Sequence, residues 1–242
     1  MATFISKETV NRLLKDVRHI IKNPLVDQGI YYTHSDTDML KGYAMIVGPY
    51  QTPYFGGFYM FEFTYPNDYP HSPPRVNYCT NGNDIRFNPN LYKCGKVCVS
   101  LLNTWEGDQW TSCQTISSVL LTLCTLLCGD PLLNEPGVTR EHHDIKNYTE
   151  IIEYSNLNVA VCDILMRKRG VYQPFFDIFY PSIKENFNKN YDKLLEFAQK
   201  KIVELGEKNV TFKTGFYNMN VTVNYGDIIL KLNTAKKMLE NI

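Results

Sequence analysis

The residue types that could do chemistry are concentrated in one segment, RFNPNLYKCGKVCVSLL, which covers residues 86–102. Within it Asn90 precedes Cys98 by eight residues, with Gly95 between them. A thiol can carry an acyl group as a thioester, and a neutral carboxamide can donate a hydrogen bond to the oxyanion that forms when an amine attacks. The pair is also compatible with a buried cysteine and an asparagine in a turn. Acyl transfer is therefore a hypothesis that the flanking sequence must decide.

The flanking motifs occur in a specific order. Upstream is the segment GPYQTPYFGGFYMFEFTYPNDYPHSPPRV, and downstream are a tryptophan-bearing loop and the apolar stretch TISSVLLTLCTLL. With these motifs the sequence resembles the ubiquitin-conjugating enzymes over roughly residues 5–165. Its SLLNTWEG and NEPG segments are most similar to the conjugating domain of the very large BRUCE (apollon) type of hybrid conjugating-enzyme/ligase. The resemblance implies an α+β class with the UBC fold: an N-terminal helix, a four-stranded antiparallel meander, an active-site loop, a central helix, C-terminal helices and a C-terminal extension.

The same resemblance implies catalytic roles. Cys98 would accept ubiquitin, or a ubiquitin-like protein, as a glycyl thioester from the activating enzyme and transfer it to lysines of protein substrates. Asn90 would stabilise the oxyanion and brace the loop. An acidic residue across the cleft would orient the lysine, with Glu135 as the best match and Asp130 as the alternative. No cofactor is implied, because ATP is used by the activating enzyme and not by this chain.

Docking surfaces can be carried over in the same way. Arg12 and Lys15 match the activating-enzyme surface, although their basic helix face is also compatible with simple solvation. His71 and Ser112 match the ligase surface, where the family has a bulky apolar residue at the position of His71. We therefore expect weak binding to generic ligases. The protein would then either use a dedicated ligase as a further partner or, like the large hybrid enzymes it resembles, modify substrates directly. Asn88 replaces the family's usual histidine, and its amide is expected to keep the hydrogen bonds of the turn.

Hydrophobic periodicity predicts the elements that position these residues. Alternating residues predict strands over 43–47 and 58–63, and prolines between 66 and 74 predict a loop that rejoins the sheet near Val76. Helical spacing predicts a central helix over 115–128 and another over 148–164. The first helix is predicted from the apolar stripe Val10, Leu13, Leu14, Val17, Ile20 and Ile21.

We divide the chain into a conjugating core (1–165), a C-terminal helical extension (166–206) and a tail (207–242). In the extension, Pro174 is expected to open a helix and Pro181 to kink it. The tail alternates first like a hairpin and then like a short amphipathic helix. Its role stays open between a partner-binding addition and a cover for the core.

Composition limits the classes of function. The chain has 242 residues, of which 44% are hydrophobic and 21% charged, with a formal net charge of zero. It can bury a full core, and it offers no general attraction to nucleic acid or acidic membranes. Its first residues lack the apolar core of a secretory signal, so the seven cysteines are expected to be free thiols in a reducing compartment. These features predict an intracellular protein of the cytoplasm, the nucleus or both.

Two other classes of function compete with conjugation. Relatives of this fold can act as non-catalytic modules that bind ubiquitin or a partner, and a cysteine hydrolase would need a histidine base near Cys98. The CxxxC spacings at 94–98 and 124–128 suggest zinc only weakly, because the second pair lies in the apolar central helix. We expect no metal.

Overall fold

A computed structural model describes residues 5–82, 85–206 and 209–240 of the chain. The first four residues of the predicted core and the first and last two of the predicted tail lie outside the described residues. The first helix, α1, spans Lys7–Lys22 and begins after Ser6, whose hydroxyl accepts a backbone N–H of the first turn. Only part of the predicted apolar stripe is buried. With about 3.6 residues per helical turn, some residues of the stripe lie at the margin of the helix face that packs on the rest of the protein. Leu13 and Ile20 are buried, whereas Leu14 and Ile21 are exposed.

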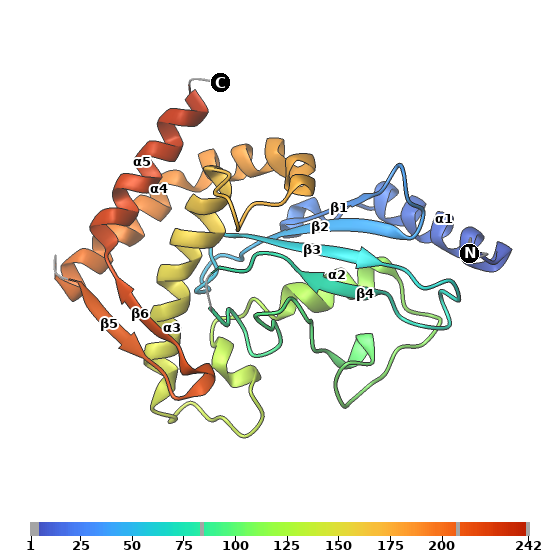
Figure 1. Cartoon of the computed structure of the whole chain (residues 1–242), viewed down its shortest axis with the longest axis horizontal. Coiled ribbons are helices and arrows are strands. Elements are labelled where there is room, and N and C mark those ends of the chain that lie inside the picture. Colours follow the sequence, from blue (N-terminus) through green and yellow to red (C-terminus); the bar gives the residue numbers. More distant parts are fainter. Residues whose placement is uncertain (1–4, 83–84, 207–208, 241–242) are drawn as a thin grey trace.

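An antiparallel sheet forms the centre of the fold (Figure 1). Its strands follow the chain order β1-β2-β3-β4 and span Ile30–His34, Lys41–Val47, Phe58–Thr64 and Arg75–Tyr78. The α+β class and the four-stranded meander are thus confirmed. The proline-rich segment leaves the sheet after β3 and rejoins it at β4, as predicted.

Both faces of this sheet are covered, which explains why β3 is buried at successive positions. On one face the Tyr59 hydroxyl donates to Asn156 Oδ1 at 2.7 Å. On the other face the ring of Tyr43 stacks on that of Phe175 at a centroid distance of 4.7 Å. Register places Tyr43 and Tyr59 on opposite faces, so the segment after residue 170 covers a face that a shorter chain would expose.

The helices follow the sheet in chain order. The central helix α2 spans Ile116–Thr125, and Thr115 and Ser118 form a capping box at its start. Helix α3 spans Asp144–Ser155 and continues as a π-helical stretch over Asn156–Asp163. A short 3₁₀ segment, Pro174–Phe179, leads into α4, which spans Tyr180–Leu205.

Pro181 does not kink a helix as we predicted. It lies in the first turn of α4, where its missing N–H would have had no partner within the helix. Helix α4 therefore begins at this proline rather than bending at it.

The described tail consists of a hairpin and a helix. Strands β5 (Val210–Lys213) and β6 (Asn220–Val223) pair with each other, and α5 spans Tyr225–Glu240. The hairpin packs on α3 and α5 packs along α4 (Figure 1). Apolar side chains of α5, among them Ile228 and Leu232, are fully buried in the same cluster as the sheet. The tail therefore covers the core. No helix in the described ranges combines the length and apolarity needed to cross a bilayer.

Candidate active site

Cys98 and Asn90 lie together in the loop between β4 and α2. The backbone N–H of Cys98 donates to the carbonyl of Asn90 at 2.9 Å, and Asn90 Nδ2 donates to the carbonyl of Cys98 at 2.6 Å. The Cys98 thiol donates to the carbonyl of Thr104 at 2.9 Å and the residue is 3% exposed. The two predicted residues are thus joined by a reciprocal pair of hydrogen bonds that fixes the loop around the thiol.

A glycine makes this tight loop possible. Gly95 has φ of +90°, and a Cβ added there would lie 2.2 Å from Asn77 Oδ1. Its carbonyl accepts the backbone N–H of Tyr78 at 2.7 Å. The loop is therefore pinned to the end of β4 at a position that only glycine fits.

Asn88 takes over the bonding of the turn before Asn90. The side chain is completely buried, and its Nδ2 donates to the carbonyl of Leu126 at 2.8 Å. Its Oδ1 accepts from the backbone N–H of Asn90 at 2.9 Å and from Asn134 Nδ2 at 3.3 Å. As expected, the amide makes turn-stabilising hydrogen bonds in place of the family's histidine.

The two acidic candidates have different surroundings. Glu135 follows Asn134, which bonds to Asn88, and precedes Pro136, which lines one surface pocket together with Thr104. Its carboxylate accepts a hydrogen bond from the Tyr217 hydroxyl. Asp130 instead forms an ion pair with Arg140 at 3.1 Å, in which both side chains are largely exposed. These contacts connect Glu135, and not Asp130, to the turn that precedes Asn90. The role of Glu135 in orienting lysine stays a prediction.

Two residues of this region were missed by the sequence reasoning. The guanidinium carbon of Arg86 lies 3.5 Å from the ring centroid of Tyr92 and 4.7 Å from that of Tyr217. Arg86 also donates to the carbonyls of Asn88 at 3.2 Å and Pro89 at 2.5 Å. Arg86 directly precedes the FNPN motif, and this position could have predicted a contact with the turn. Nothing in the sequence linked Tyr217 to this loop.

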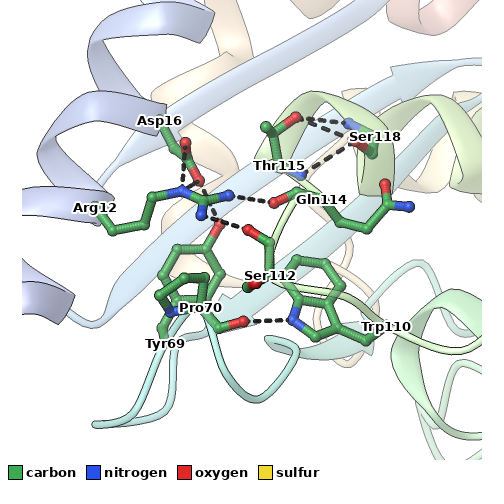
Figure 2. Close-up of polar contacts among 9 residues, drawn as sticks. All are labelled: Arg12, Asp16, Tyr69, Pro70, Trp110, Ser112, Gln114, Thr115 and Ser118. Atoms are coloured by element: carbon green, nitrogen blue, oxygen red, sulfur yellow. Dashed lines mark hydrogen bonds and ion pairs between the residues drawn. The ribbon is translucent and has the colours of Figure 1, made fainter.

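Two of the predicted docking residues, Arg12 and Ser112, lie at the junction between α1 and the segment that leads into α2 (Figure 2). Arg12 forms an ion pair with the buried carboxylate of Asp16 at 3.0 Å and donates to the carbonyl of Ser112 at 2.5 Å. Arg12, the exposed Lys15 and Ser112 line one surface groove. The structure thus brings Arg12 and Ser112 together, and it leaves Lys15 with more freedom for a partner than Arg12.

His71 lies in the proline-rich loop beside this junction. It is largely exposed, and its Nε2 is 3.2 Å from Glu8 Oε1. The neighbouring Pro70 carbonyl accepts a hydrogen bond from the Trp110 indole at 2.7 Å (Figure 2), and Trp110 is buried as a packing anchor. Trp105, in contrast, is 47% exposed on the loop that follows Cys98.

All seven cysteines are free thiols. Burial raises the pKa of four of them, which keeps these thiols protonated and weakly nucleophilic at neutral pH: Cys79 (to about 11), Cys124, Cys128 and Cys162. The other three are Cys94, Cys98 and Cys113. Of these, Cys98 is the one that bonds to Asn90.

In the part of the chain that the structure describes, one group of three side chains could hold a metal ion, namely His142, His143 and Asp144. No cysteine belongs to it. Asp144 Oδ2 accepts the backbone N–H of Phe216 at 2.9 Å, and Nδ1 of His142 accepts the backbone N–H of Asp144 at 3.1 Å. These atoms already serve the start of α3 and its contact with the tail.

Comparison with known proteins shows the family to which the chain belongs. The sequence model described as Ubiquitin-conjugating enzyme matches residues 12–173. The chain belongs to the ubiquitin-conjugating enzyme family, and the predicted family and fold are confirmed.

The chain is also similar to individual proteins of this family. Ubiquitin-conjugating enzyme E2 Z of Danio rerio is 42% identical over 186 residues, which cover 76% of this chain and 56% of the relative. The Homo sapiens protein of the same name is 38% identical over 235 residues, or 96% of this chain and 64% of the relative. The Homo sapiens dual E2 ubiquitin-conjugating enzyme/E3 ubiquitin-protein ligase BIRC6 is 47% identical over 110 residues, or 43% of this chain and 2% of that protein. The chain thus spans about 56–64% of the length of these two E2 Z relatives.

Proposed function

We propose that this protein accepts ubiquitin, or a ubiquitin-like protein, as a thioester on Cys98 and transfers it to lysine amines of protein substrates. The observation that carries the proposal is the reciprocal hydrogen bonding of Cys98 and Asn90 in a loop pinned by Gly95. In the first step the Cys98 thiolate attacks the activating enzyme's thioester, and the activating enzyme's thiolate leaves. In the second step a neutral lysine amine attacks, the Cys98 thiolate leaves as the amide forms, and the proton that the nitrogen loses passes to the thiolate or to solvent.

The second step needs a donor for the oxyanion. Asn90 Nδ2 carries two N–H bonds, and the Cys98 carbonyl uses one of them. The other is available to the developing negative oxygen. Glu135 would hold the incoming lysine through its carboxylate. The transfer requires no cofactor in this chain, because the thioester already carries the activated acyl group.

The partners of the proposed reaction are the ubiquitin-like cargo, the activating enzyme, protein substrates and a dedicated ligase. The groove that contains Lys15 and Arg12 is the proposed activating-enzyme site, and the surface around His71 and Ser112 is the proposed ligase site. Reaction through a free thiol suits a reducing compartment such as the cytoplasm or nucleus.

The test is thioester formation. The protein is incubated with activating enzyme, ATP and a panel of ubiquitin-like proteins, and adducts are separated on a non-reducing gel. We expect a thiol-sensitive adduct that Cys98→Ser converts to a thiol-resistant ester and Cys98→Ala abolishes, while Cys94→Ala is the matched control and charges normally. Loss of the adduct in Cys94→Ala instead would refute the assignment. Retained ubiquitin binding without any adduct would support a non-catalytic binding module.

A further inference from the structure

The tip of the tail hairpin reaches the candidate active site. Tyr217 lies between β5 and β6, and its hydroxyl donates to Glu135 Oε2. Its carbonyl accepts from Lys93 Nζ at 3.4 Å, and its ring centroid lies 6.1 Å from that of Tyr148. A residue of the tail thus bonds both to the candidate acid Glu135 and to Lys93 of the thiol loop.

The backbone holds Tyr217 in an unusual conformation. Its φ is +59° and the φ of Asn218 is +49°, so two successive residues occupy the left-handed region. Asparagine and glycine adopt this region readily, but a bulky aromatic residue rarely does. The turn is anchored beside Tyr217, where the Phe216 N–H donates to the buried Asp144 carboxylate at 2.9 Å. A strained aromatic residue fixed by its neighbour is typical of a functional position.

Tyr217 also supports the other side of the site through Arg86. The Arg86 guanidinium is held between the rings of Tyr92 and Tyr217 and donates to the carbonyls of Asn88 and Pro89. Those carbonyls directly precede Asn90. One tail side chain therefore contacts both the candidate acid and the arginine that braces the oxyanion turn.

We propose that Tyr217 is a positioning residue that completes the site for the acceptor lysine, an inference that rests on the proposed function. By bonding to Glu135 Oε2, the hydroxyl orients the carboxylate and leaves Oε1 for the lysine ammonium. By packing on Arg86, the ring keeps the turn before Asn90 in place. The tail is then part of the aminolysis site and not only a cover for the core.

The test uses the full chain, charged with ubiquitin and then discharged onto free lysine over a range of concentrations. Tyr217→Phe removes the hydroxyl and keeps the ring on Arg86, so we expect kcat/KM for lysine to fall about tenfold while charging stays normal. Tyr217→Ala removes both contacts and should be slower still. Tyr225→Phe is the matched control, because its hydroxyl is buried in the same tail without a hydrogen-bond partner among the described residues. It should discharge normally.

A double-mutant cycle separates positioning from folding. If Tyr217 acts through Glu135, then Tyr217→Phe adds little to the defect of Glu135→Gln. Multiplicative effects, a normal or faster Tyr217→Phe, or a normal Glu135→Gln would each overturn the inference while leaving Cys98 charging intact. Failure of the unaltered protein to form any adduct would instead refute the proposed function itself.

Discussion

Replacing Asn90 by alanine separates the two tasks of its carboxamide. One N–H bonds to the Cys98 carbonyl at 2.6 Å, and a hydrogen bond of this kind contributes about 1 kcal/mol to the free energy of unfolding. The other N–H is proposed to bond to the oxyanion, and losing such a donor raises the activation free energy by about 3 kcal/mol. We therefore expect Asn90→Ala to fold with a modest loss of stability and to discharge onto lysine about two orders of magnitude more slowly.

The assay measures both steps in one preparation. Charging of Cys98 is followed under conditions that limit the activating enzyme, and discharge is followed as a single turnover after charging is stopped. The free energy of unfolding comes from urea titration of the same variant. Charging should stay within a few-fold of the unaltered protein, because the loop keeps the Cys98 N–H bond to the Asn90 carbonyl.

The relative sizes of the effects decide the interpretation. If Asn90→Ala slowed charging and discharge equally and lost several kcal/mol of stability, the residue would have a folding role only. Asn90→Asp is a useful companion variant, because it retains the size of the side chain but removes both N–H donors, and it should discharge as slowly as the alanine variant.

Three further predictions concern docking and stability. His71→Phe should increase the stimulation of discharge by a generic RING domain, because an apolar ring replaces a largely exposed imidazole. Strong stimulation of the unaltered protein by such a domain would contradict the prediction. Lys201→Met should lower the free energy of unfolding, measured in urea, by about 3 kcal/mol, because it leaves Glu153 on α3 without its cation. Lys200 is exposed, so Lys200→Met is the control and should have little effect. Equal losses in the two variants would refute the ion-pair argument. Burial lowers the pKa of His34 below 6.5, so the unfolded chain binds the proton more readily than the folded chain. The stability present above pH 6.5 should therefore be lost as pH falls from 6.5 through the lower pKa of the folded state. His34→Gln should flatten this dependence in urea titrations, and an unchanged profile would exclude His34 as its source.

Local pattern predicted much of the fold because it reports directly on backbone geometry. Alternation at 58–63 and prolines up to Pro74 anticipated β3 and the start of β4 at Arg75. The resemblance implied four strands, but local pattern did not locate the strand Ile30–His34. Its polar and aromatic residues alternate weakly, and its partner on the sheet decides its conformation. Pro181 was misread for a similar reason. A proline suits either a kink or a first turn, and the point where α4 begins depends on packing against the sheet.

For the active site, the motif around Cys98 and Asn90, read together with its flanking segments, predicted a thiol next to a carboxamide, because the two residues are only eight apart in one glycine-containing loop. The choice between Glu135 and Asp130, the bracing by Arg86 and the contact of Tyr217 depend on segments distant in sequence. No local preference places a tail residue beside a loop near residue 90. That arrangement follows from the burial of α5 and the hairpin against α3 and α4, and this packing is a property of the tertiary structure alone.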